Sequence, residues 1–202
     1  MSRGLIILDA GHGQFGNPYL VIEGVYEGTR NFVLAGYLKA ELEALGFEVM
    51  LTRNAITEDP SLEERGRMAG DNGAVLFLSL HSNAPGSATP PEKYKDIKGV
   101  LVIYSLSDEE RNLPIALAFG DAVAACMDTQ NRGAITRTYP DQPGIDYYGV
   151  LRHSVASGCN CAFIIEHGFH TNPDDAAFLN SDACMAKLAK VEAEVINRVF
   201  SV

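Results

Sequence analysis

Short apolar runs alternate along the chain with longer stretches whose apolar residues recur at helical spacing. The apolar runs have the length and composition of buried strands and lie at residues 5–8, 47–53, 74–80, 99–105 and 161–165. The first helical stretch has a stripe of leucines and the last has a stripe rich in valine, namely Leu34, Leu38, Leu42, Leu45 and Leu188, Val191, Val195, Val199. Strands that alternate with helices favour a parallel sheet covered on both faces. The pattern therefore predicts an α/β fold, a single three-layer domain with a mostly parallel twisted sheet and helices on both faces.

Several residues mark where the helices are expected to begin. Thr29 is placed to cap the first helix, because its hydroxyl can accept a hydrogen bond from the backbone of the first turn. Ser61 and Glu64 have the spacing of a capping box, which predicts a second helix directly after them. A long helix is expected over residues 108–128, kinked or begun at Pro114.

Three of the apolar runs are followed, directly or after a short turn, by a residue that can bind a metal or move a proton. These residues are His12, His81 and Glu166. The carboxyl ends of parallel strands share one edge of a sheet, and open α/β sheets bind their ligands there. We therefore expect the three side chains to meet at this edge although they are far apart in sequence.

A zinc site is the chemistry that this set of residues favours. Catalytic zinc takes three protein ligands of the His and Asp/Glu type and keeps a fourth position for water. His12, Glu27 and His81 match that set, and Glu166 remains as the base that removes and delivers a proton. Glu27 has a second interpretation as a capping charge, because it lies just before the first helix. Asp9 either forms the turn after the first strand or orients a ligand histidine.

Composition and charge exclude several classes of protein. The 202 residues suit one domain with a substantial core, so residues 1–202 are expected to form a single unit with no separate wall-binding domain. A net charge of −10 argues against a nucleic-acid partner. No apolar run is long enough to span a bilayer, and we expect no signal peptide because only a few residues precede the first strand. The four cysteines are expected to be reduced, structural thiols.

The motifs resemble a known family over nearly the whole chain. The segments LDAGHG, SLEERGRMA, LFLSLHSNA and IIEHGFHTNPDDAAFL occur in this order and look like the successive signatures of the zinc-dependent N-acetylmuramoyl-L-alanine amidases called Amidase_3. The resemblance implies hydrolysis of the amide bond between N-acetylmuramic acid and L-alanine of the stem peptide in bacterial peptidoglycan. It also implies that His12, Glu27 and His81 bind one zinc ion (Zn2+) per chain and that Glu166 is catalytic.

The chain departs from the family pattern at a few positions. Gln14 replaces a frequent glycine, and the loop that follows is long, which makes Glu23 the alternative to Glu27 as a ligand. His167 and His170 stand where the family more often has apolar or small residues. We interpret them as surface or packing histidines, or at most as groups that line the groove or support the ligands.

Some interpretations stay open at this point. A zinc peptidase of the same fold and an inactive wall-binding relative are the alternatives to an amidase. The Pro-rich loop at residues 84–96 is either a rim of the site or a tolerated insertion, and Tyr139, Tyr147 and Tyr148 either line a groove or pack within a loop. The implied substrate lies outside the membrane, so phage-type release, export by a non-standard route or a removed leader would have to bring the protein there. An unidentified activator or targeting partner is a further expectation.

Overall fold

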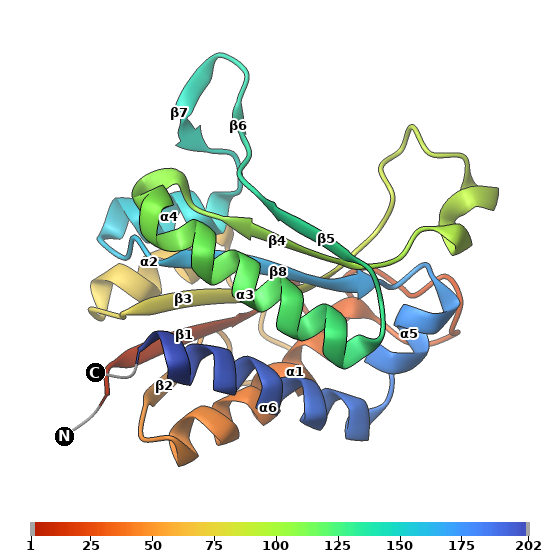
Figure 1. Cartoon of the computed structure of the whole chain (residues 1–202), viewed down its shortest axis with the longest axis horizontal. Helices are drawn as coiled ribbons and strands as arrows, with labels where there is room; N and C mark the ends of the chain where they lie inside the picture. Colours follow the sequence, from red (N-terminus) through yellow and green to blue (C-terminus); the bar gives the residue numbers. More distant parts are fainter. Residues whose placement is uncertain (1–2, 201–202) are drawn as a thin grey trace.

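In the computed structural model, which describes residues 3–200, one central sheet has the strand order β2-β1-β3-β8-β4-β5 (Figure 1). Its strands are β1 (Leu5–Ala10), β2 (Glu48–Leu51), β3 (Leu76–Asn83), β4 (Val100–Tyr104), β5 (Asn131–Ile135) and β8 (Ala162–Phe169). β1, β2, β3 and β8 run parallel, whereas β4 is antiparallel to β8 and β5 runs with β4. The prediction of a mostly parallel sheet is confirmed, and the carboxyl ends of β1, β3 and β8 share one edge.

Helices cover both faces of this sheet (Figure 1). One face carries α1 (Glu27–Ala44), α3 (Glu109–Met127) and α6 (Asp182–Val199), and the other carries α2 (Leu62–Asp71) and α4 (Gly149–Ser157). The larger apolar cluster lies beneath α1, α3 and α6 and contains both stripes' buried leucines and valines, while a smaller cluster lies beneath α2 and α4. The three-layer prediction is therefore confirmed.

The first helix starts earlier than its sequence pattern predicts. α1 begins at Glu27 after the N-cap Tyr26, so the prediction that Thr29 caps the helix is wrong. Thr29 lies in the first turn, where its hydroxyl donates to the carbonyl of Gln14 at 2.8 Å. The Thr29 hydroxyl is thus bonded to the preceding loop and does not cap the helix. Glu27 is the first residue of α1 and does not lie in front of it.

The other two helix predictions are close to the structure. Ser61 and Glu64 form the predicted capping box, because the Ser61 side chain accepts from the Glu64 backbone and the Glu64 carboxylate accepts from the Ser61 backbone. α3 begins at Glu109 and contains Pro114 in its interior. α5 (Pro173–Leu179), directly after β8, is a short helix that Asn172 caps.

Two excursions leave the layered body (Figure 1). One is the Pro-rich segment after β3, which includes the 3-10 helix η1 (Pro91–Asp96). The other is the hairpin of β6 (Thr138–Tyr139) and β7 (Gln142–Asp146), which precedes α4. A second 3-10 turn, η2 (Leu106–Asp108), leads into α3.

The cysteines agree with the expectation of reduced, structural thiols. All four cysteines are free thiols, and Cys159 and Cys161 are buried. Within residues 3–200, none of the helices combines the length and the apolar character that crossing a bilayer requires.

Candidate active site

Three side chains predicted as metal ligands lie together at the carboxyl edge of the sheet. In His12, Glu27 and His81 the candidate ligand atoms all lie within 4.8 Å of one another. Oε1 of Glu27 is 3.0 Å from Nδ1 of His81, and Oε2 is 3.3 Å from Nε2 of His12. The structure therefore brings together one carboxylate and two imidazoles, whereas the alternative ligand Glu23 is exposed on the loop outside this group.

Local backbone geometry explains how the three segments come so close. His12 follows β1 with a φ of 61°, in the left-handed region that a non-glycine residue rarely adopts. The preceding Gly11 leaves room for the His81 ring, since a Cβ there would lie 2.2 Å from its Nε2. In α1, a Cβ at Gly28 would lie 1.8 Å from the carbonyl oxygen of Gly13, so the absence of a side chain at Gly28 lets α1 approach the His12 loop closely.

Glu27 is an ionised carboxylate in this setting. Burial by itself raises the pKa of Glu27, but the contacts with His12 and His81 outweigh it and hold the pKa well below its usual range. Its Oε1 also accepts hydrogen bonds from the backbone N–H of Ser82 at 2.9 Å and from the Asn31 amide at 3.3 Å. Burial lowers the pKa of His81, yet Glu27 more than compensates and raises it to about 9. A cation that binds here replaces a proton that the His81 ring holds.

Glu166 occupies the next position across the sheet. β3 and β8 pair so that His81 lies opposite Glu166, which places both side chains on the same face. Burial raises the pKa of Glu166 to about 7, while nearby His81 opposes the rise and Glu27 adds to it. Its Oε2 is buried and has no hydrogen-bond partner among the described residues. A carboxyl group that gains and loses its proton near neutral pH suits general acid–base chemistry.

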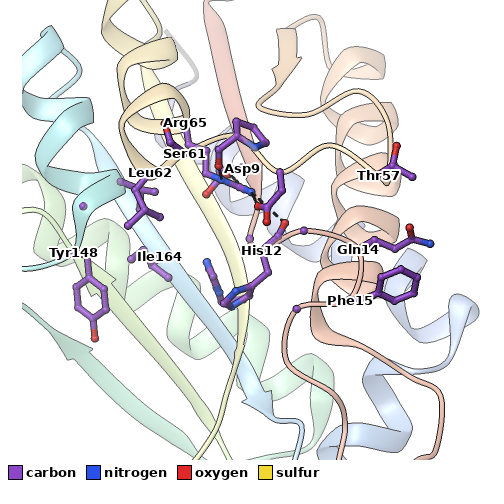
Figure 2. Close-up of a pocket in the computed structure, with 18 residues that line it drawn as sticks. Asp9, His12, Gln14, Phe15, Thr57, Ser61, Leu62, Arg65, Tyr148 and Ile164 are labelled. Atoms are coloured by element: carbon purple, nitrogen blue, oxygen red, sulfur yellow. Dashed lines mark hydrogen bonds and ion pairs between the residues drawn. The ribbon is translucent and has the colours of Figure 1, made fainter.

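A cavity of about 870 Å³ opens beside His12 and His81, the two candidate histidine ligands. Figure 2 shows Phe15 on one side of His12, and Leu62 and Tyr148 on the other. Leu62 opens α2 and Tyr148 is the N-cap of α4, so the amino ends of both helices of this layer border the cavity. The volume lies within the range of about 300–1,000 Å³ that small-molecule sites span.

Asp9 has a different role from the two that the sequence suggested. It lies inside β1 and is fully buried, so the prediction that it begins a turn is wrong. Its carboxylate accepts hydrogen bonds from the hydroxyls of Thr52 and Ser79 and pairs with Arg65 at 2.8 Å. Burial raises the pKa of Asp9, but Arg65 and the two hydroxyls lower it below its usual value. Among the described residues, the hydrogen bonds of Asp9 go to Thr52, Ser79 and Arg65 and not to a candidate ligand histidine.

Two arginines that sequence reasoning missed support the His12 loop. Arg65 donates to the carbonyls of Ala10 at 2.9 Å and His12 at 3.2 Å. Arg53 donates from Nε to the same Ala10 carbonyl at 3.0 Å, and it reaches the Gly28 carbonyl on α1 as well. Both side chains are almost completely buried, which few arginines are.

His167 and His170 are buried, which excludes a surface position and agrees with their other interpretation as packing histidines. His167 bridges the backbone carbonyl of His81 at 2.9 Å and the carboxylate of Glu192 at 2.8 Å. His170 lies 3.0 Å from the hydroxyl of Ser82. Both histidines thus support the segment of β3 that carries a candidate ligand.

The tyrosines named from the sequence form one cluster. Tyr147 packs against Tyr139 and Tyr148 with ring centroids 5.2 and 5.5 Å apart, and Tyr148 also lines the cavity. Packing within the loop and lining of a groove, which the sequence left open, therefore both occur.

Comparison with known proteins yields one consistent group. Residues 6–198 match the family Amidase_3, described as N-acetylmuramoyl-L-alanine amidase. The chain is 28% identical over 187 residues to the N-acetylmuramoyl-L-alanine amidase LytC of Bacillus subtilis (strain 168), a match that covers 92% of this chain and 33% of LytC. The chain thus spans about a third of the length of that relative.

Solved structures of amidases have the same fold. The amidase AmiC2 of Nostoc punctiforme superposes with a TM-score of 0.78 at 25% identity, over 98% of this chain and 97% of AmiC2. The CwlD amidase of Clostridioides difficile, solved in complex with the GerS lipoprotein, gives a TM-score of 0.78 at 22% identity and covers 98% of both chains.

Proposed function

The chain belongs to the Amidase_3 family of N-acetylmuramoyl-L-alanine amidases, and from that premise we propose that it hydrolyses the amide bond between N-acetylmuramic acid and L-alanine in peptidoglycan. The observation that carries the proposal is the arrangement of His12, Glu27 and His81 beside Glu166 at the edge of an open cavity. This arrangement combines a cation site, an acid–base group and room for a substrate.

The proposed cofactor is one zinc ion per chain, held by His12, Glu27 and His81. The donor set fits the ion, because two imidazoles and an ionised carboxylate are ligands that catalytic zinc sites use. When bound, zinc polarises the carbonyl of the scissile amide and makes a water molecule more acidic. The hydrogen bonds from Asn31 and the Ser82 backbone fix the orientation of the Glu27 carboxylate before the ion arrives.

Glu166 is the proposed acid–base residue. Its carboxylate removes a proton from the attacking water, and its carboxylic acid then delivers that proton to the alanine nitrogen as the amide bond breaks. A pKa of about 7 makes both protonation states accessible near neutral pH. The buried Oε2 has no hydrogen-bond partner among the described residues, so no contact there stabilises the ionised form, which agrees with the raised pKa.

The test incubates the zinc-loaded protein with purified peptidoglycan, with and without a chelator, and identifies the new chain ends by mass spectrometry. The proposal predicts chelator-sensitive release of intact stem peptides with free L-alanine amino ends. Cuts within the stem peptide would replace the amidase with a zinc peptidase of the same fold. Zinc binding without any cut would indicate an inactive wall-binding protein or the need for an activating partner.

Two variants make the assignment of Glu166 specific. Glu166→Gln keeps the shape and the size of the side chain, so it should still bind zinc while turnover falls by a factor of about 100 or more. Glu194→Gln makes the same chemical change on an exposed side chain of α6 and serves as the control. Turnover that survives in Glu166→Gln would remove Glu166 from the mechanism and leave the metal site in place.

The proposed place of action is the bacterial cell wall, where the substrate lies. The solved complex of CwlD with the GerS lipoprotein supports the addition of a protein partner to the proposal. Such a partner would supply targeting or activation, and adding it to the digest would then raise the rate of release.

A further inference from the structure

Asn17 reaches two of the three candidate ligands from the loop that connects them. Its Nδ2 lies 2.8 Å from Oε2 of Glu27 and 3.1 Å from Nε2 of His12. These are the two ligand atoms that face each other at 3.3 Å. A single amide nitrogen therefore sits beside both groups that a cation would join.

The chemistry of these groups fixes the direction of the contacts. The Glu27 carboxylate also accepts hydrogen bonds from the Ser82 backbone and the Asn31 amide, and the group of Asn17 that faces it is the amide nitrogen, which donates. That nitrogen has two hydrogens, one for the carboxylate and one that points to His12. The Nε2 of His12 accepts the second hydrogen when it carries its lone pair, which is the form that binds a metal.

The backbone holds Asn17 in place for this contact. Asn17 has a φ of 50°, in the left-handed region that asparagine adopts more readily than most residues. Its carbonyl accepts from the backbone N–H of Glu27 at 2.9 Å, and the carbonyl of Gly16 accepts from Gly28 at 3.2 Å. Asn17 is thereby fixed to the first turn of α1, and thus to Glu27, through the main chain as well as the side chain.

We propose that Asn17 is a positioning residue of the metal site, which holds Glu27 and His12 in ligand geometry and gives up His12 when the cation binds. The inference rests on the proposed function, because it assumes the metal centre of His12, Glu27 and His81. The Nε2 of His12 has one lone pair, so a cation and the Asn17 hydrogen exclude each other there. A carboxylate oxygen has a second lone pair, so Asn17 keeps its hydrogen bond to Glu27.

Zinc affinity, measured by competition with a chelator of known affinity, tests the proposal without any substrate. Asn17→Gly removes the amide and accepts the positive φ, while Asn17→Ala removes the same amide at a strained position. Both should bind zinc about 10-fold to 100-fold more weakly, which is the usual cost of losing a group that orients a ligand. Leu20→Ala, on an exposed side chain of the same loop, should leave the affinity unchanged.

Nuclear magnetic resonance adds a readout that a purely structural role would not move. The side-chain amide signals of Asn17 are identified by their absence in Asn17→Gly. On addition of zinc to the wild-type protein, one of the two hydrogens should shift strongly, because it loses His12, and the other should shift little. Thermal unfolding of the metal-free variants checks that a change in zinc affinity is not the result of unfolding.

Each outcome bears on one of the two proposals. Weaker zinc binding in both variants, together with the unequal amide shifts, supports the positioning role. Equal or tighter binding in folded Asn17→Gly would overturn it and leave the metal centre intact. If the wild-type protein itself does not bind zinc, the metal centre of the proposed function fails, and the role of Asn17 fails with it.

Discussion

Replacing Glu166 with Gln should make the metal-free protein more stable at neutral and higher pH. The ordinary pKa of 4.5 for this carboxyl rises to about 7 in the folded protein because the group is buried. Between these values the unfolded chain has already lost the proton that the folded protein still holds. The free energy of unfolding therefore falls as the pH rises from 4.5 through 7, and this loss disappears when the carboxyl group is replaced by an amide.

The size of the effect follows from the shift. One pKa unit corresponds to about 1.4 kcal/mol, so the shift to about 7 costs about 3 kcal/mol once the pH is well above 7. Between about pH 5.5, which is above the isoelectric point, and about pH 8, the advantage of Glu166→Gln over wild type should grow by about 2 kcal/mol.

Urea unfolding in the presence of a chelator measures this difference. Unfolding is followed by circular dichroism, because the chain has no tryptophan whose fluorescence could report it. Glu194→Gln is the matched control, since it makes the same change on the exposed side of α6. A constant difference between Glu166→Gln and wild type at every pH would refute the reasoning, because it would mean that Glu166 ionises alike in the folded and unfolded chains.

Three further changes test the residues around the candidate ligands and the proposed metal. Gly11→Ala places a Cβ 2.2 Å from Nε2 of His81, so the ring must move. Zinc affinity, measured by chelator competition, should fall by a factor of about 100, and unchanged affinity would contradict the geometry. Arg65→Met leaves the buried Asp9 carboxylate without the arginine that neutralises it, and should lower the free energy of unfolding in urea by about 3–5 kcal/mol. A loss below about 1 kcal/mol would show that Asp9 does not need the ion pair with Arg65. Removal of the metal by a chelator should abolish release of stem peptides, and added zinc should restore it; activity that persists without metal would exclude zinc catalysis.

The sequence predicted the layers of the fold because buried strands and amphipathic helices leave local patterns. The apolar run before His81 and the run before Glu166 are both strands, and each continues past the functional residue. The sequence could not predict the antiparallel direction of β4 or the presence of β5 next to it. An apolar run looks the same in either direction, and three of the five residues in β5 are exposed, so that strand lacks the pattern of a buried one.

The sequence predicted only those site residues whose type and position after a strand or before a helix indicate a function. The ligand atoms of His12, Glu27 and His81 do come together, but that they bind zinc stays a prediction. Burial of Asp9 within β1 was missed because the charge is compensated from Arg65, 56 residues further along, and by hydroxyls from β3 and the segment after β2. No local pattern shows that an aspartate has such partners.

The two buried arginines explain why the loop that carries His12 can keep its unusual backbone. Arg53 and Arg65 both donate to the carbonyl of Ala10, the last residue of β1, and Arg65 also holds the carbonyl of His12 itself. A positive φ at a histidine costs of order 1–3 kcal/mol and persists only where surrounding contacts over-determine it. Since Arg53 follows β2 and Arg65 belongs to α2, the position of the first candidate ligand depends on the correct packing of two distant elements. The candidate metal site is therefore complete only when the sheet and α2 are both in place, which couples cation binding to the fold as a whole.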